Sequence, residues 1–195
     1  MKRRYEQKER ARRQEETRQR IVEATAALHE EVGPARTTVA EIARRAGVQR
    51  LTVYNHFPEE AELFGACSAH FMATHPMPDP GPWTQIADPA KRLRRAATEL
   101  YRRHGETEAM TANVLRDAEG MPALRDVIAR GREAYEAAVG EILLAGRGLR
   151  GKRKQKVAAA IGLALSFTTW QHLVRRNGLS PGDAVDTVCA MVEAV

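Results

Sequence analysis

The segment from Gln49 to Phe57 places hydrogen-bonding side chains beside apolar ones at helical spacing. Val53 and Phe57 recur after four residues and form one apolar stripe. The polar side chains fall largely off that stripe: Gln49, Arg50, Thr52, Asn55 and His56. Guanidinium, hydroxyl, amide and imidazole groups on a free helix face can hydrogen-bond base edges and phosphates in a DNA groove. The segment is therefore a candidate recognition helix.

The residues before this segment supply a second helix and a tight turn. Thr38 and Glu41 have the spacing of a capping box, in which the threonine side chain accepts the N3 amide and the glutamate returns to the N-cap amide. Ala43 and Ala46 are small enough to let another helix approach closely. Gly47 can adopt the left-handed backbone that a sharp helix end needs. Residues 38–57 thus predict a helix-turn-helix that presents one polar face.

The same residues resemble the DNA-binding end of the tetracycline-repressor (TetR-like) family of bacterial transcriptional regulators. The resemblance runs from about Thr17 to Phe64, roughly a quarter of the chain. It rests on an ordered combination of residues: Thr38, Ile42-Ala43, Ala46-Gly47-Val48, Thr52, Tyr54, His56-Phe57 and Leu63. The sequence departs from the family pattern at two positions. Leu51 stands where the family commonly has glycine or proline, and Glu60 stands where it often has a phosphate-contacting lysine.

The resemblance implies a set of DNA contacts. The candidate DNA-binding residues are Thr38, Arg50, Leu51, Thr52, Tyr54, Asn55 and His56. By their matching positions, Arg50 and Thr52 are expected to reach base edges, while Tyr54, His56 and Thr38 are expected to hold phosphates. Leu51 would place an aliphatic side chain against a thymine methyl group.

The basic charge of the chain is concentrated at its N-terminus. Residues 1–20 carry nine Lys or Arg against four Glu, an excess of five in a chain whose net charge is +6. Residues 21–57 carry four charges of each sign. Such an arm can be a solvated tail, or it can follow the phosphate backbone or enter a minor groove. We favour a DNA contact, because the neutral motif needs another source of long-range attraction.

The composition of the 195 residues and the positions of helix-ending residues predict an all-α fold. Few segments show the alternation of apolar and polar residues that is typical of strands. The expected domains are a basic arm (residues 1–16), a helix-turn-helix domain (17–64) and an effector-binding and dimerisation domain (65–195). Segments predicted as helices beyond the motif include 58–75, 88–104, 122–145, 152–176 and 180–195. Two distant cysteines and the lack of an apolar N-terminal signal lead us to expect a cytoplasmic protein. No apolar run reaches the roughly 20 residues of a membrane span, so no membrane association is expected.

The last two predicted helices carry apolar stripes that a single small domain would not cover entirely: Ile161, Leu165, Thr168 and His172 on one, and Val185, Val188, Cys189 and Val192 on the other. A palindromic operator requires two recognition helices about one DNA turn apart, which a symmetric dimer provides. The family resemblance implies that these helices form the homodimer interface. We therefore expect a homodimer on double-stranded DNA.

The few large or polar-tipped side chains between residues 88 and 172 are candidates for lining an apolar effector pocket: Tyr101, His104, Phe167 and Trp170. The histidines and cysteines lack metal-ligand spacing, and no nucleophile, base and orienting residue form a catalytic set. We therefore expect no enzyme, no metal and no cofactor. The interpretation is a repressor that a small, largely apolar ligand releases from its operator. The alternative is a non-inducible accessory or architectural DNA-binding protein whose C-terminal domain only dimerises.

Overall fold

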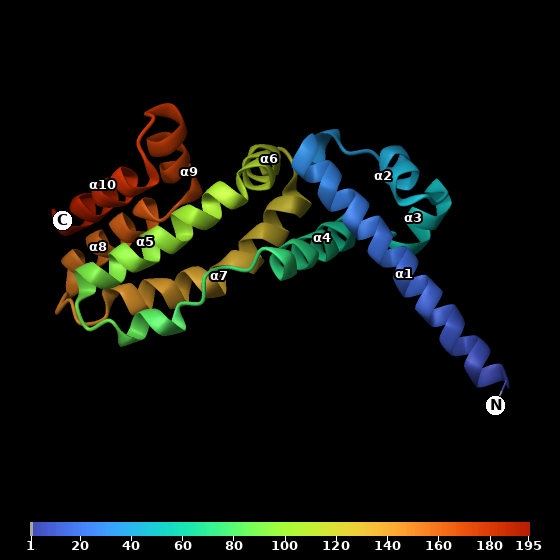
Figure 1. Ribbon diagram of the computed structural model, residues 1–195, viewed down its shortest axis with the longest axis horizontal. Coiled ribbons are helices and arrows are strands. Elements are labelled where there is room, and N and C mark those ends of the chain that lie inside the picture. The colour runs from blue at the N-terminus through green and yellow to red at the C-terminus, as the bar shows by residue number, and fades with distance from the viewer. Residues whose placement is uncertain (1) are drawn as a thin grey trace. The chain divides into compact units, whose positions relative to one another are not determined.

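The computed structural model describes residues 2–195, with side chains from residue 4 onward. It confirms the predicted all-α class, since no strand occurs among these residues. The α-helices, labelled in Figure 1, are α1 (Lys2–Glu31), α2 (Val39–Ala46), α3 (Arg50–His56), α4 (Glu60–Thr74), α5 (Pro89–Glu106), α6 (Glu108–Ala118), α7 (Pro122–Leu144), α8 (Gly151–Ala164), α9 (Phe167–Trp170) and α10 (Pro181–Glu193). Short 3₁₀ segments occupy Pro34–Arg36 and Gly81–Gln85, and a π-helix occupies Gln171–Arg176.

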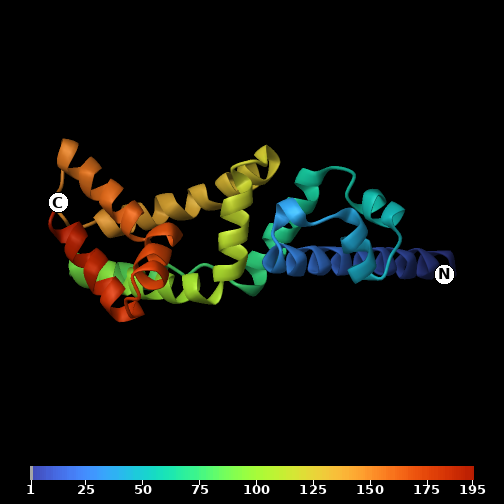
Figure 2. The same cartoon turned by 90° about the horizontal axis from the view of Figure 1, so that it is seen from above.

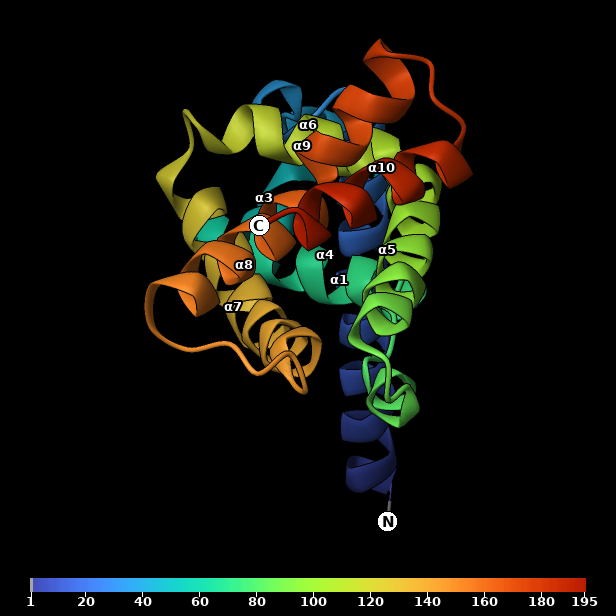
Figure 3. The same cartoon turned by 90° about the vertical axis from the view of Figure 1, so that its left-hand side faces the viewer.

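Inter-residue contacts divide the chain into two compact units. The first contains the chain up to Pro76 together with Ala109–Ala129, and the second contains Met77–Glu108 with Arg130–Val195. Thus α4, α6 and the start of α7 pack with the N-terminal helices. The first compact unit therefore includes residues after position 64, where the predicted DNA-binding domain ends. In the second unit, α10 packs against both α5 and α8 (Figure 3). The division into arm, DNA-binding domain and effector domain stays a prediction about function.

In the first unit, polar side chains of α6 hold the C-terminal end of α1. The Asn113 side-chain amide donates to the carbonyl oxygens of His29 and Glu30, at 3.1 and 2.8 Å. The Asp117 carboxylate accepts the Ala35 amide at 3.0 Å and pairs with Arg116 at 2.7 Å. The last carbonyls of a helix have no partner within it. The Gly33 amide already bonds to the His29 carbonyl, so Asn113 chiefly satisfies the carbonyl of Glu30. We call Asn113, Arg116 and Asp117 the α6 clasp.

The segment 152–176 is not the single long helix that its apolar composition suggested. The chain breaks at Leu165 and Ser166, and the Ser166 hydroxyl accepts the Thr169 amide at 3.2 Å as the N-cap of α9. A serine side chain can replace a backbone acceptor in this way, which makes a new helix start favourable inside an apolar run. The pieces on either side are bent by 59°.

Arg92 is buried although it lies in a charged run, residues 91–95. Its guanidinium is buried and donates to the carbonyl oxygens of Ile86, Ala87, Ile142 and Ala145. Five N–H donors allow one arginine to satisfy several carbonyls at once. Arg92 therefore ties the start of α5 to the end of α7 within the second unit.

Within the described residues, no single helix is both long and apolar enough to cross a bilayer, although the bent pair Gly151–Ala164 and Phe167–Arg176 meets that criterion on length and composition alone.

The clasp generates a stability prediction at Gly33, whose backbone has φ 91° and ψ 157°, a region that only glycine adopts readily. A Cβ atom there would lie 2.5 Å from the Asp117 carboxylate and also collide with the Arg116 guanidinium. We expect Gly33→Ala to lower the free energy of unfolding by about 3 kcal/mol, combining backbone strain with loss of charged hydrogen bonds. Urea unfolding followed by circular dichroism measures this.

Gly65→Ala is the matched control, because Gly65 lies inside α4 and a Cβ there would meet nothing within 4 Å. Alanine should stabilise that helix by about 0.5–1 kcal/mol. If both substitutions changed stability in the same direction, the clasp would not constrain Gly33.

Candidate nucleic-acid interface

The turn between α2 and α3 forms as its residues predict. The Thr38 hydroxyl accepts the Glu41 amide at 3.2 Å, and Gly47 has φ 65° and ψ 42° in the left-handed region. Only half of the expected capping box forms, because the Glu41 carboxylate pairs with Arg44 at 3.0 Å instead of returning to the Thr38 amide. An arginine three residues further along the helix offers a stronger, charged partner than a neutral backbone amide.

The inner side of α3 is fixed by burial. Val53 and Phe57 are buried in a cluster that includes Ile21 of α1 and Ala46 of α2. A helix of seven residues has little stability by itself, so this packing holds it in place. The orientation of its outer side follows from the same contacts.

The outer side of α3 presents the predicted DNA-binding residues together. Leu51 and Tyr54 are 66% and 54% exposed, Arg50 and Asn55 are exposed, and Thr52 and His56 are half-buried. Within the described chain, no hydrogen bond or ion pair engages the side chains of these polar residues. Thr38 lies exposed at the start of α2, with its hydroxyl already engaged as the helix cap. The result is a surface of unused donors and acceptors around one exposed leucine.

Other arginines of this unit support the motif. Arg45 makes two hydrogen bonds of 2.6 and 2.8 Å with Glu31, joining α2 to the end of α1, and this pairing lowers the pKa of the Glu31 carboxyl group. Arg20 donates to the Ala46 carbonyl at 3.2 Å, and the Arg18 guanidinium lies 4.6 Å from the centre of the Phe57 ring. Sequence reasoning missed these roles, because the partners lie far apart in the chain and no local spacing connects them.

The four candidate pocket residues come together in the second unit. Their rings form one buried cluster, in which the His104 ring centre lies 5.6 Å from Phe167 and 6.0 Å from both Tyr101 and Trp170. The break after α8 leaves the backbone carbonyls of Ala164 and Leu165 without helical partners, and residues of the cluster contact them. The Tyr101 hydroxyl donates to the Ala164 carbonyl at 2.8 Å, and His104 Nε2 lies 3.0 Å from the Leu165 carbonyl.

His104 carries one polar atom without a partner. Its side chain is 7% exposed, and Nδ1 has no hydrogen-bond partner among the described residues. A carbonyl oxygen can only accept, so Nε2 must carry the hydrogen and Nδ1 must be a lone-pair acceptor. Burial lowers the pKa of His104 to about 4, which keeps the ring neutral near pH 7.

Residues 21–67 match the family described as bacterial regulatory proteins, tetR family. The chain is also similar to the HTH-type transcriptional regulator TtgR of Pseudomonas putida, with 44% identity over 61 residues. That match covers 31% of this chain and only 29% of the relative.

Solved structures extend the likeness to the whole fold. A tetR-family transcriptional regulator from Streptomyces coelicolor superposes with a TM-score of 0.66 at 17% identity, covering 92% of this chain and 80% of the other. A transcriptional regulator from Rhodococcus sp. Rha1 gives a TM-score of 0.61 at 18% identity, covering 90% and 95%. The family match thus covers the N-terminal domain at residues 21–67, and over the rest of the chain the likeness is one of fold.

Proposed function

We propose that this protein is a cytoplasmic, homodimeric transcriptional repressor that binds a palindromic operator through α3 and is released by a small, largely apolar ligand. The observation that carries DNA binding is the outer side of α3, where exposed side chains keep unused hydrogen-bonding groups beside Leu51. Arg50 can read a guanine edge with two hydrogen bonds, and Tyr54 can hold a phosphate.

A dimer formed through α8 and α10 would use other interface residues than those that the sequence suggested. Val185, Val188 and Val192, which the sequence suggested for an interface, are already buried within the chain. Leu163 of α8 and Met191 of α10 are instead 60% and 51% exposed. Large exposed apolar side chains on two helices that pack together support a partner at this face. A symmetric dimer formed there would supply the two recognition helices that a palindrome requires.

The aromatic cluster supports a ligand of defined chemistry. A buried acceptor without a partner costs about 1–3 kcal/mol, and a ligand that brings a donor to His104 Nδ1 would recover part of that cost. The surrounding Tyr101, Phe167 and Trp170 rings favour an apolar, flat body. Such a ligand would resemble a phenol, with an aromatic ring and one hydroxyl donor.

The non-inducible alternative also has support. Tyr101 and His104 Nε2 already bond to the backbone, and the ring distances of 5.3–6.0 Å are those of an ordinary packed core. In that case the second unit would serve dimerisation alone. Ligand binding separates the two functions.

Two substitutions on α3 test DNA recognition. Arg50→Ala should cost about 1–3 kcal/mol of binding to the operator and relax the preference at one base pair, because a base-edge contact is lost. Tyr54→Phe removes only a hydroxyl group and should weaken all DNA sequences alike. Titration of both variants against a selected operator and its single-base substitutions measures the effects. Unchanged base preference in the Arg50→Ala protein would rule out its assigned contact.

A naphthol and its methyl ether test the ligand site, because the ether keeps the ring and lacks the donor. The naphthol should bind the native protein about 3- to 10-fold more tightly than the ether, the value of one hydrogen bond. In His104→Phe this preference should disappear. Thermal-shift titrations provide both comparisons, and binding of neither compound would favour the non-inducible alternative.

A further inference from the structure

The basic arm is a regular helix continuous with the first helix of the DNA-binding unit. α1 runs unbroken from Lys2 to Glu31, and Figure 2 shows it as one rod. At 1.5 Å per residue its length is about 45 Å. Because α1 and α3 share one buried cluster and Arg18 lies over the Phe57 ring, the helical repeat of α1 fixes which arm residues face α3. A helix is too wide to enter a minor groove, so the helical arm could meet a duplex only at the phosphate backbone or in a major groove.

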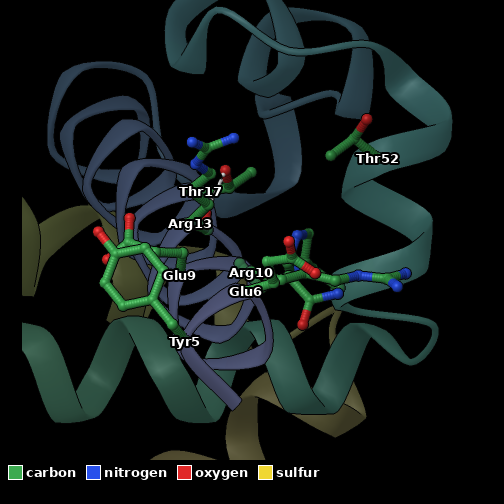
Figure 4. A pocket seen from close by; sticks show the side chains of 9 residues that line it. Tyr5, Glu6, Glu9, Arg10, Arg13, Thr17 and Thr52 are labelled. Atoms are coloured by element: carbon green, nitrogen blue, oxygen red, sulfur yellow. Dashed lines mark hydrogen bonds between the residues drawn. The ribbon is translucent and has the colours of Figure 1, made fainter. Parts of the chain in front are cut away.

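An open groove of about 610 Å³ lies between the arm and the recognition helix (Figure 4). From α1 it is lined by Tyr5, Glu6, Glu9, Arg10, Arg13, Gln14 and Thr17, and from α3 by Thr52 and His56. Thr52 and His56 are one helical turn apart on the side of α3 that faces the arm. The groove therefore adjoins the predicted DNA-reading surface directly.

Two arginines in this groove lack partners. Neither Arg10 nor Arg13 makes an ion pair or hydrogen bond through its guanidinium with any residue that the structure describes. Each has a glutamate four residues earlier, the spacing at which helical ion pairs form, yet neither pair is made. Glu9 instead binds Arg12 at 3.0 Å, and Arg12 also binds Glu16 at 2.9 Å. Glu6 is left as the one carboxylate in the groove without an ion pair among these residues.

We propose that this groove holds the phosphate backbone of the DNA strand that borders the major groove entered by α3. Arg10 and Arg13 supply the positive charge from the arm, and the Thr52 hydroxyl and the His56 ring supply donors from the opposite side. This assigns Thr52 to a phosphate and not to a base edge. The inference rests on the proposed DNA-binding function and adds a second anchoring surface to it.

The arm offers a charge-matched control. Arg4 and Lys8 are exposed on the same helix but do not line the groove, and the 3.6-residue repeat places them on the opposite side from Arg10 and Arg13. The double variants Arg10→Gln/Arg13→Gln and Arg4→Gln/Lys8→Gln remove equal charge and keep side chains that favour a helix. The two double variants differ only in which face of the arm helix loses its positive charge.

The test measures binding to a random-sequence DNA duplex between about 50 and 200 mM salt, since phosphate contacts do not depend on sequence. The Arg10→Gln/Arg13→Gln protein should show a slope of log affinity against log salt that is smaller by about 1.8 for each bound subunit. The Arg4→Gln/Lys8→Gln protein should keep most of the native slope. The Glu6→Gln protein should bind DNA more tightly than the native protein, because the substitution removes a carboxylate that would repel a phosphate in the groove.

Equal loss of slope in the two double variants would overturn the proposal, since the arm would then act through its net charge alone. No binding of the native protein to any duplex would overturn the DNA-binding function itself, which separates the two failures. Circular dichroism of the variants confirms that the arm keeps its helix.

Discussion

Burial of Val53 and Phe57 in the apolar cluster that α3 shares with α1, α2 and α4 is the interaction on which the rest of the N-terminal unit depends. A seven-residue helix gains almost nothing from its own hydrogen bonds, so this packing alone determines which side of α3 faces out. The same helix α1 continues into the arm at one end and meets the α6 clasp at the other. One rigid element therefore sets the position of the recognition helix, the arm groove and the turn that begins at Gly33.

Arginine serves three different purposes in this chain, and its surroundings decide which. Arg45 and Arg20 join helices of the N-terminal unit, where a planar guanidinium can bond two oxygens at fixed distance. Arg92 is buried and satisfies four backbone carbonyls in the second unit. Arg10, Arg13 and Arg50 remain without partners among the described residues, next to or on the outer side of α3. The free guanidinium groups next to and on α3 thus offer a surface for an anion.

The second unit depends on a local break in an apolar helix. Ser166 starts α9 and leaves the carbonyls of Ala164 and Leu165 without helical partners, and α5 meets them with Tyr101 and His104. Satisfying these carbonyls fixes the tautomer of His104 and turns its other nitrogen into an acceptor enclosed by aromatic rings. A structural requirement of the backbone has therefore produced the polar atom that would give an apolar ligand its orientation.

The sequence by itself determined the helical class, the turn at Gly47, the cap at Thr38, and the inner and outer sides of α3. The turn and the cap depend on contacts between residues at most four apart, and the inner side of α3 could be predicted from the four-residue spacing of Val53 and Phe57, although tertiary packing is what holds it. Only the tertiary structure decided that Glu41 turns to Arg44, that Arg92 is buried, that the segment 152–176 breaks, and that α6 closes on α1. It also decided which face of the arm lies beside α3. The burial of Arg92 and the closing of α6 on α1 depend on partners tens of residues away, which no local pattern specifies. The partner of Glu41 and the break at Ser166 involve residues three apart, but local rules allow either outcome and the three-dimensional geometry decides between them.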